Sequence, residues 1–517
     1  MLRLLRTIQY LKFVQIRYRV YYLIRKKLKM DKPSKSTQYL ENNNEVSLLD
    51  SISSQKSLKN FEFTFLNFRH DFVGKTDWNL SVYGKLWTYN LTYFDFLHQE
   101  NISKEEGLYL INDFLQQFDG LKDALEPFPI SLRGINWIKF LSKYDIQNKQ
   151  IDYSLFLQYN LLMHNLEYHL LGNHLLENAF SLLFGSYYFK NETFYLKAKR
   201  LLIAELNEQV LDDGAHFELT PMYHQIMLFR VFDCINLVEN NSWKNRELLS
   251  FLKQKASLML GWLNVVTFKN GDIPLFNDSA NKIAPTTAEL NKYANRLKIK
   301  EKKLKLESSG YRKFQQNRYE LIVDVGNIGP DYIPGHAHSD TFNFELYIDE
   351  KPIIIDTGIS TYETNNRRTL ERSTDSHNTV MLENKNQSEV WGGFRVAQRA
   401  RIIQLKETEN SIEATHDGYK SMGTYHKRKF IIKEEHIFIE DFIEGETLEA
   451  SAYIHFHPDV TVIVQEKTVL VNNFILEFET NNIELEEYSF APEFNKLEKA
   501  KKIKINFTKS LKMEIRI

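Results

Sequence analysis

Residues 296–325 read RLKIKEKKLKLESSGYRKFQQNRYELIVDV and contain the change of pattern that decides the fold. The first ten of them, residues 296–305, are dense in charge, which is typical of a solvated helix face or of a domain boundary. Residues 319–325 instead alternate apolar and polar side chains and are rich in β-branched and aromatic types, as expected of a strand. The stretch therefore predicts a helical domain over residues 57–305 and a sheet domain over residues 306–517.

Upstream of this boundary, apolar residues repeat with the 3.6-residue period of an amphipathic helix. Ile135, Ile138 and Leu141 lie on one such face. Consecutive helices joined by short turns fit a bundle, a solenoid or a toroid of hairpins, and periodicity does not choose among these. The other periodic rows occupy residues 153–170, 174–190, 192–211, 222–239 and 247–267.

Downstream, apolar and polar residues alternate in runs at residues 342–348, 429–432 and 437–442. Turn-forming pairs occur at Asn472-Asn473 and Asn481-Asn482. The pattern predicts a large antiparallel β-sandwich packed against the helical domain. The fold class is thus a multidomain α+β protein.

The first 56 residues are interpreted as a basic amphipathic N-terminal arm followed by a connector. Residues 1–30 contain leucines, isoleucines and tyrosines at helical spacing among basic residues, and no acidic residue precedes Asp31. A helix docked on its own domain is the favoured interpretation, and a peripheral contact with an anionic membrane is the alternative. Residues 31–56 are polar and aperiodic, which indicates an exposed connector. We see no signal peptide or spanning segment, which favours a cytoplasmic or cell-envelope-associated protein.

Composition limits the class of partner. The chain has 517 residues, of which 43% are hydrophobic and 26% charged, and a net charge of -1. This near-neutral balance gives no global attraction to nucleic acid, so any preference for an acidic partner depends on local groups. A single cysteine, Cys234, excludes an intrachain disulfide framework and is interpreted as a buried small hydrophobe. Composition leaves the oligomeric state open.

The segment Gly335-His336-Ala337-His338-Ser339-Asp340 offers two imidazoles separated by one residue. His338 is followed 18 residues later by Asp356 and 21 residues after that by His377, which together make a candidate zinc set of two histidines and one carboxylate. Such a set could be structural, or it could activate water at an open fourth position, as in a metal-dependent hydrolase.

Several residues of the helical half could carry chemistry or have ordinary structural roles. Asn173 suits a helix N-cap, and His174 and Glu177 lie within one turn of it. Tyr223 and His224 follow Pro221 at what reads as a helix start. Arginine can bind a carboxylate through two hydrogen bonds and tryptophan can stack on a sugar face, although ion pairs and packing are equally ordinary uses. The residues of this kind are Arg133 and Trp137 in the helical half and Trp391 and Arg395 in the β-half.

The order and separation of these motifs resemble the heparinase II/III-like polysaccharide lyases of the alginate lyase/heparinase superfamily. The resemblance covers roughly residues 75–400. It implies an incomplete (α/α) toroid before the β-sandwich, a periplasmic location as an alternative, and β-elimination of a uronate-containing polysaccharide to 4,5-unsaturated products. The motifs that carry it are Asn173-His174-Leu175-Leu176-Glu177-Asn178, Glu218-Leu219-Thr220-Pro221-Met222-Tyr223-His224, Gly335-His336-Ala337-His338-Ser339-Asp340, Ile355-Asp356-Thr357-Gly358, Ser376-His377-Asn378-Thr379 and Trp391-Gly392-Gly393-Phe394-Arg395.

The resemblance also implies roles for residues of the helical half. Asn173 matches a residue that hydrogen-bonds the uronate, and His174 matches a candidate base for one C5 epimer. Glu177 corresponds to a carboxylate near the uronate. Tyr223 matches the catalytic tyrosine that protonates the glycosidic oxygen, and a nearby cation would help its phenol to ionise. His224 is interpreted as a neighbour that orients Tyr223.

In the β-half, the resemblance makes His336 a catalytic histidine that neutralises the carboxylate or assists proton transfer. His338, Asp356 and His377 match the ligands of a structural divalent metal, which we expect to be zinc. Two other function classes stay open: a metal-dependent glycan hydrolase, and a non-catalytic glycan-binding or assembly protein that uses aromatic side chains as stacking platforms.

Overall fold

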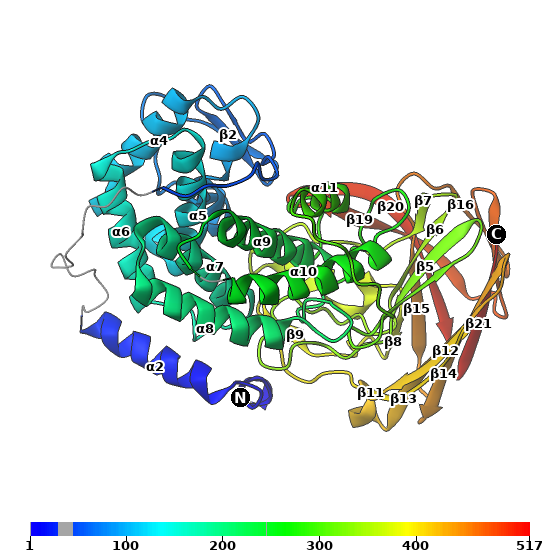
Figure 1. Cartoon of the computed structure of the whole chain (residues 1–517). Helices are drawn as coiled ribbons and strands as arrows, with labels where there is room; N and C mark the ends of the chain where they lie inside the picture. Colours follow the sequence, from blue (N-terminus) through cyan, green and yellow to red (C-terminus); the bar gives the residue numbers. More distant parts are fainter. Residues whose placement is uncertain (1, 29–44, 245) are drawn as a thin grey trace.

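The computed structural model describes residues 2–28, 45–244 and 246–517 and places helices before sheets along the chain (Figure 1). The helices follow the predicted periodic rows closely, except that the row at 153–170 ends earlier, at His164. The helices are α1 (Leu2–Ile8), α2 (Phe13–Lys27), α3 (Lys85–Tyr93), α4 (Lys104–Gln116), α5 (Pro127–Lys143), α6 (Lys149–His164), α7 (Gly172–Phe189), α8 (Glu192–Gln209), α9 (Pro221–Asn240), α10 (Glu247–Val266), α11 (Thr287–Arg296) and α12 (Asn366–Glu371).

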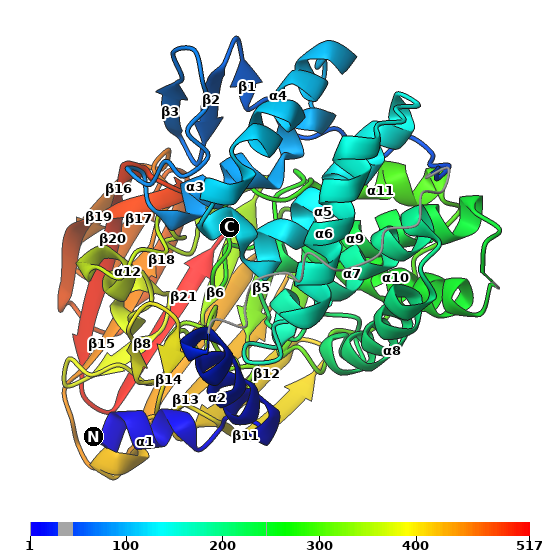
Figure 2. The ribbon, with the colours of Figure 1, turned by 90° about the vertical axis from the view of Figure 1, so that its left-hand side faces the viewer.

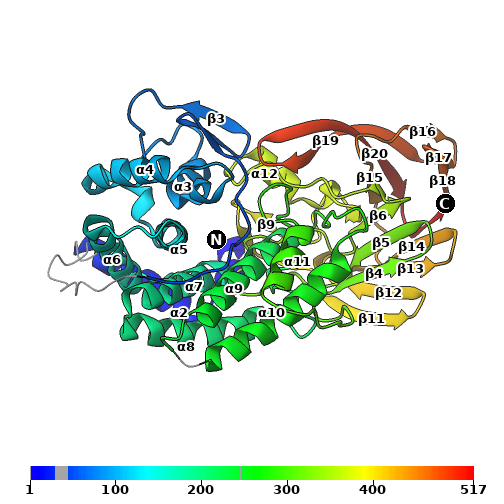
Figure 3. The ribbon, with the colours of Figure 1, turned by 45° about the horizontal axis from the view of Figure 1, so that its top comes forward.

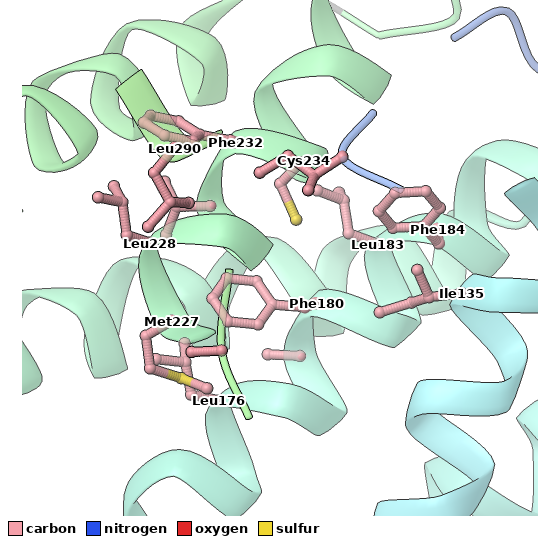
Figure 4. Packing of buried hydrophobic residues seen from close by; sticks show 14 of the residues in the cluster. Ile135, Leu176, Phe180, Leu183, Phe184, Met227, Leu228, Phe232, Cys234 and Leu290 are labelled. Carbon is pink, nitrogen blue, oxygen red and sulfur yellow. The ribbon is translucent and has the colours of Figure 1, made fainter. Parts of the chain in front are cut away.

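Helix α7 lies at the centre of the helical part. Nearly all of its side chains are buried, so its sequence is apolar around most of its circumference. Phe180 and Leu183 of α7 pack with Leu228 and Phe232 of α9 (Figure 4). Cys234 lies in the same core and is fully buried, which confirms its interpretation as a small hydrophobe.

The sheets after residue 305 are antiparallel, which confirms the predicted class of the C-terminal part. One sheet has the order β4-β5-β6-β7, one has the order β19-β20-β15-β8, and the largest has the order β11-β12-β13-β14-β21-β18-β17-β16. The strands are β4 (Tyr311–Gln315), β5 (Tyr319–Asp324), β6 (Phe344–Ile348), β7 (Lys351–Ile354), β8 (Val380–Leu382), β9 (Val390–Trp391), β10 (Arg395–Val396), β11 (Ile402–Thr408), β12 (Ser411–His416), β13 (Thr424–Ile432), β14 (His436–Gly445), β15 (Ala450–His455), β16 (Val462–Gln465), β17 (Thr468–Val471), β18 (Phe474–Phe478), β19 (Ile483–Glu493), β20 (Lys496–Phe507) and β21 (Ser510–Arg516).

Alternation in the sequence becomes alternation of burial in the sheets. Along β13 and β14, every second side chain is buried, and Phe430 lies opposite Ile439 across the strand pair. The buried faces of the three larger sheets share one hydrophobic core. Figure 3 shows β19 and β20 on the opposite side of this core from β11–β13.

Strand β5 explains how the two halves meet. All six of its side chains are buried, because Leu321 and Val323 face the β-core while Ile322 belongs to the hydrophobic cluster of the helical part. The sheet β4-β5-β6-β7 therefore has one face toward the other sheets and one toward the helices. The predicted boundary at residue 305 falls in the segment between α11 and β4.

Two features near the N-terminus differ from the prediction. Residues 58–71 form a small sheet of β1 (Leu58–Lys59), β2 (Glu62–Phe65) and β3 (Phe68–Asp71), which the sequence analysis missed. Residues 45–56 form a partly exposed connector that is attached to the helical part: Val46 and Ile52 are buried, and the Leu49 N–H donates to Asn236 of α9 at 2.9 Å. Residues 31–44 of that predicted connector lie outside the described residues.

The arm formed by α1 and α2 runs along the outside of the molecule (Figures 1 and 2). It contacts the helical part through Tyr18, which stacks on Tyr168 at 4.5 Å between ring centroids, and the β-part through Arg3, whose Nε donates to Glu389 at 2.8 Å. The predicted docked helix is therefore present, although it bridges both halves of the chain. None of the helices among the described residues is long and apolar enough to cross a bilayer.

Candidate functional site

The first turn of α7 presents Asn173 at the boundary between the two halves. The Asn173 Nδ2–H donates to Glu218 Oε2 at 2.8 Å, and its main-chain N–H donates to Glu218 Oε1 at 3.1 Å. This close approach depends on Gly172, which has φ +57° and where an added Cβ would lie 2.6 Å from Glu218 Oε1. Asn173 is inside the helix and caps nothing, so the predicted N-cap role is wrong: Leu171 holds that position.

Tyr223 and His336 meet across the same boundary. Tyr223 lies in the first turn of α9, after the predicted Pro221 start, and its ring centroid is 4.1 Å from that of His336. The Tyr362 hydroxyl donates to the Tyr223 hydroxyl oxygen at 3.3 Å. His336 Nε2 is 3.5 Å from Asn173 Nδ2 and 3.8 Å from Glu218 Oε2. Asn173, Tyr223 and His336, three predicted catalytic residues that are distant in sequence, thus lie together, with Asn173 and Tyr223 next to the His336 imidazole.

Asp278 fixes the orientation of that imidazole. His336 Nδ1–H donates to Asp278 Oδ2 and His338 Nε2–H donates to Asp278 Oδ1, both at 2.8 Å. The guanidinium of Arg368 also donates to both carboxylate oxygens of Asp278. Burial opposes ionisation of this carboxyl, but Arg368 and the two histidines hold its pKa well below its usual range. With Nδ1 engaged, His336 keeps Nε2 directed toward Asn173.

The surroundings of Tyr223 correct one electrostatic expectation. A neighbouring cation was expected to ease loss of the phenolic proton. Burial instead raises the pKa of Tyr223, and the charges of Asp278 and Glu218 add to the shift, although Tyr362 and Arg368 oppose it. Burial also favours the neutral form of Glu218, yet His216, His336 and Asn173 lower the pKa of Glu218. Tyr223 therefore rests as a neutral phenol next to an ionised carboxylate.

His174 is partly exposed and forms an ion pair at the start of α7. Its Nδ1–H donates to Glu167 at 3.0 Å, and its ring lies 4.6 Å from that of Phe128. Burial opposes the charged imidazole, but Glu167 outweighs burial and raises the pKa of His174. The pKa of Glu167 is lowered in turn, since His174 and Asn178 outweigh the effect of its own burial.

These opposed shifts give stability a defined pH window. Because the pKa of His174 is raised in the folded state, this group stabilises the fold at pH values below the ordinary histidine pKa of 6.5, and the stabilisation is lost as pH rises through the folded pKa. Because the pKa of Glu167 is lowered in the folded state, this group stabilises the fold at pH values above the ordinary glutamate pKa of 4.5, and the stabilisation is lost as pH falls through the folded pKa. The loss of Tm on His174→Gln, followed by thermal melts across pH, is therefore expected to be largest between about pH 4.5 and 6.5 and to shrink in alkali. His436→Gln, which breaks a more exposed pair with Glu514, is the control and should show a smaller loss. A loss for His174→Gln that grows toward alkaline pH would contradict the assignment.

Glu177, four residues after Asn173 in α7, forms a buried ion pair. It is 1% exposed, and Arg230 Nε donates to its Oε1 at 3.3 Å. Burial raises the pKa of Glu177 despite that partner. The structure places Glu177 in an ion pair between α7 and α9, because both helices turn these side chains inward, and its position near the uronate stays a prediction.

Three other predicted site residues are also buried: Arg133 and Trp137, which were expected to bind the sugar, and His224, which was expected to orient Tyr223. Arg133 donates to Gln158 and to the carbonyl oxygens of Thr92 and Ala124 at 2.8–3.1 Å, and burial lowers the pKa of Arg133 to about 9. Trp137 is fully buried in the helical core. His224 faces away from Tyr223, accepts from the His216 N–H and donates to Met259 O, and its pKa is lowered to about 3 by burial. All three predictions are wrong for the same reason: these side chains point into the core.

Arg133→Met is accordingly expected to affect stability and to spare substrate binding. The change leaves buried acceptors without a donor, which should destabilise the fold by about 2–3 kcal/mol. Urea melts and KM on a cleavable polymer measure the two effects separately. The exposed Arg395 provides the matched control, since Arg395→Met should leave stability unchanged. An increase in KM for Arg133→Met at unchanged stability would restore its predicted role.

The segment from Trp391 to Arg395 contacts the site through an unexpected residue. Trp391 Nε1–H donates to Thr7 of the N-terminal arm at 3.1 Å, and the Arg395 guanidinium lies over the Trp391 ring. Phe394, which we did not predict, lies 6.1 Å from the His336 ring between centroids. Trp391 and Arg395 are thus in contact with each other, and Trp391 also with the arm, while Phe394 borders the His336 imidazole.

The predicted zinc ligands lie close together but fit a metal only in part. The His338 and His377 rings are 5.2 Å apart, and within the described residues His338 Nδ1 and His377 Nε2 have no hydrogen-bond partner. Asp356, however, accepts from His377 Nδ1–H at 2.7 Å and from Asn343 at 2.5 Å. No group of three or more His, Cys, Asp or Glu side chains in the described ranges is arranged to hold a metal ion. The metal stays a prediction.

A separate cavity of about 840 Å³ is lined by residues 45–53, Lys139 and Arg296, among others. Its polar lining includes Lys139, whose Nζ donates to the buried Asp233 at 2.8 Å. None of the predicted catalytic or metal-binding residues lines it, so it offers no alternative arrangement of those groups.

Sequence comparisons match both halves of the chain to one family. The model described as "Heparinase II/III N-terminus" matches residues 136–305, and "Heparinase II/III-like, C-terminal" matches residues 299–517. A curated relative, the heparin-sulfate lyase of Bacteroides stercoris, is 25% identical over an alignment of 316 residues that covers 56% of this chain and 45% of that protein. The match therefore spans less than half the length of this relative.

Solved structures share the fold at low sequence identity. The crystal structure of heparinase III has a TM-score of 0.68 at 16% identity and covers 97% of this chain and 91% of its own. The heparan sulfate lyase HepC from Pedobacter heparinus has a TM-score of 0.56 at 16% identity, with 88% and 81% covered. These likenesses confirm a helical part followed by antiparallel sheets, while the predicted (α/α) toroid stays a prediction.

Proposed function

The chain belongs to the heparinase II/III family, and we propose that it cleaves a uronate-containing acidic polysaccharide by β-elimination. The observation that carries the proposal is the contact between Tyr223 and His336, with ring centroids 4.1 Å apart, beside the amide of Asn173. Elimination needs a base for the C5 proton, an acid for the leaving O4 and a group that offsets the uronate charge. These three side chains and His174 provide such groups at the boundary between the halves.

In the proposed reaction, His336 is the base and Tyr223 is the acid. The His336 Nε2 lone pair accepts the C5 proton, the C5–H electrons form the C4=C5 double bond, and the C4–O4 bond breaks. Tyr223 then donates its phenolic proton to O4. Burial raises the pKa of Tyr223, so the phenol carries its proton at neutral pH but is a weaker acid than a phenol in water. The imidazolium returns its proton to the adjacent phenolate, so the net change is transfer of one proton from C5 to O4.

Asn173 and His174 bind the uronate carboxylate in this proposal. Glu218 accepts one of the amide hydrogens of Asn173. The other lies toward His336 Nε2, at 3.5 Å between the nitrogens, and would turn to the substrate carboxylate on binding. The raised pKa of His174 favours an imidazolium, which would offset the negative charges of the uronate and of Glu218. The same shift argues against the predicted use of His174 as a base, since a base must be unprotonated.

The function is tested by product analysis on a panel of uronate polymers. Because the curated relative is named a heparin-sulfate lyase, the panel includes a heparan-type glycosaminoglycan together with unsulfated polyuronates. A lyase yields products whose ultraviolet absorbance rises with the 4,5-double bond, and whose mass lacks the added water of hydrolysis. Saturated products from a cleaved polymer would instead favour the metal-dependent hydrolase.

Structural zinc is kept as part of the proposal. His338 Nδ1 and His377 Nε2, which have no hydrogen-bond partner in the part of the chain that the structure describes, would provide two ligands. The carboxyl of Asp356 would have to exchange at least one hydrogen bond for the metal. Bound zinc would tie together three segments of the β-half without touching substrate. No step of the proposed reaction passes through it.

Metal removal is expected to act on stability before it acts on chemistry. If zinc is structural, metal analysis should find about one ion per chain, and chelation should lower Tm with slow loss of activity. His377→Ala should lose the ion, whereas His426→Gln, a buried histidine elsewhere in the β-half, should keep it. If chelation inactivates the protein at once without changing Tm, and added metal restores the activity, the result would support the metal-dependent hydrolase. If the purified protein is stable and contains no metal, the proposed zinc site would be wrong.

A further inference from the structure

Helix α2 docks on the molecule through one face, and that face is mainly polar and aromatic. Gln15 is 1% exposed, and its Nε2–H donates to Leu170 O at 3.1 Å. Tyr18 stacks on Tyr168, and Tyr22 donates its hydroxyl to Leu166 O. Arg25 donates to His164 O at 2.6 Å. Positions 15, 18, 22 and 25 recur at helical spacing, so they form one stripe that binds the segment between α6 and α7.

The opposite face of α2 is apolar and points outward. Residues 13, 16, 20, 23 and 24 lie on it, and their exposed fractions are 78% for Phe13, 40% for Ile16, 51% for Val20, 69% for Leu23 and 53% for Ile24. An amphipathic helix that merely stabilises its own domain does the reverse and buries this face. The docking contacts hold α2 in the orientation that presents its apolar stripe to the surroundings.

Helix α1 extends the same exposed surface. Of the 26 large hydrophobic side chains that are exposed among the described residues, 11 lie within residues 2–28. A concentration of this size in so short a segment indicates an interaction site. The members in α1 and at the end of α2 are Leu2, Leu4, Leu5, Ile8, Tyr21 and Leu28.

The charge of the arm identifies the kind of partner. Residues 1–30 include nine lysines and arginines and no acidic residue. Arg17 and Lys27 are exposed at helical spacing with Phe13, Val20 and Ile24, so their charged ends can reach out beside the apolar side chains. Pairing two copies of this surface would bring like charges together, whereas an anionic lipid surface complements both the charge and the apolar stripe.

We propose that α1 and α2 form a membrane-surface anchor that binds anionic phospholipid. The apolar stripe enters the boundary between headgroups and acyl chains, and the basic residues contact lipid phosphates. The opposite stripe stays docked on the segment that leads into α7, which holds the candidate site close to the lipid surface. The inference rests on the arm alone and is independent of the proposed lyase function.

Flotation of the full-length chain with lipid vesicles tests the proposal. Vesicles with about one third phosphatidylglycerol should retain the protein and vesicles of phosphatidylcholine alone should not. The triple variant Phe13→Ser, Val20→Ser, Leu23→Ser should reduce the bound fraction at least tenfold at unchanged Tm, because these side chains face outward. The variant Leu196→Ser removes an exposed leucine of α8 and is the matched control, with binding retained.

Two further measurements test the charge of the arm and the possibility that the surface binds a second copy of the chain. Arg17→Glu with Lys27→Glu should weaken binding to anionic vesicles, and added salt should do the same to the wild type. Equal retention of the triple variant and the wild type would overturn the proposal. A lipid-independent dimer that the triple variant abolishes, seen by sedimentation in the absence of vesicles, would also overturn it by assigning the surface to a second copy of the chain.

Discussion

Tyr223→Phe is expected to lower kcat for β-elimination by about 10²–10⁴-fold, the range that general acid catalysis contributes. The variant keeps the ring that packs against His336 and removes only the hydroxyl that would protonate O4. Substrate binding depends mainly on Asn173 and His174 in the proposed reaction, so KM should change little. Initial rates of ultraviolet absorbance increase on a cleaved polymer measure both constants.

Tyr187→Phe is the matched control for this prediction. Tyr187 is fully buried in the helical part, and within the described residues its hydroxyl has no hydrogen-bond partner. Its removal should leave kcat and Tm close to those of the wild type. Turnover by Tyr223→Phe within about tenfold of the wild type would mean that the leaving oxygen takes its proton from another group, and the assignment of Tyr223 would fail.

Asp278→Asn is expected to destabilise the fold by about 3–5 kcal/mol, the cost of breaking a buried charge pair on one side. Asp278 is fully buried and accepts from Arg368, His336 and His338. An asparagine cannot accept all of these donors, and the charge of Arg368 would stay buried without its carboxylate partner. Urea melts should show the loss directly.

The same variant should also lower kcat of the folded protein, because His336 loses the acceptor that orients its ring. Asp441→Asn separates this effect from general destabilisation. Asp441 is buried in the β-core and accepts from Arg428 and His426 at 2.7–2.9 Å, so its replacement should cost comparable stability. After correction for the folded fraction, kcat should fall only for Asp278→Asn. Equal folded-state kcat in both variants would contradict a positioning role for Asp278.

The class and order of the elements could be predicted from the sequence because periodicity is a local property. Rows such as 192–211 and 222–239 became α8 and α9 with ends shifted by only one or two residues. The strand at 319–325 was found for the same reason, although its alternation concealed that both of its faces are buried. The small sheet at 58–71 was missed because its strands are too short to show a clear period.

Residues of the candidate site could be predicted from the sequence only where they lie in a motif of the family. Asn173, Tyr223 and His336 were singled out by their motifs. Glu218 and Phe394 lie in two of the same motifs, but nothing in the motifs assigned them a role, and Asp278 and Tyr362 lie in no motif. Arg133, Trp137 and His224 failed for the opposite reason, since their residue types suit a sugar site and their burial is not visible in the sequence. Burial depends on which helices pack around a side chain, and that depends on residues far away in the chain.

By itself the sequence determined the two-part architecture, the basic apolar character of the first 30 residues and the residue types available for elimination. Only the tertiary structure decided that Asp278 holds His336 and that α2 binds through its polar face and leaves its apolar face outward. The physical reason is that hydrophobic periodicity is set by neighbours three or four residues apart. Hydrogen-bond partners and the choice of buried face are instead set by contacts between distant residues, 58 apart for Asp278 and His336 and 155 apart for Gln15 and Leu170.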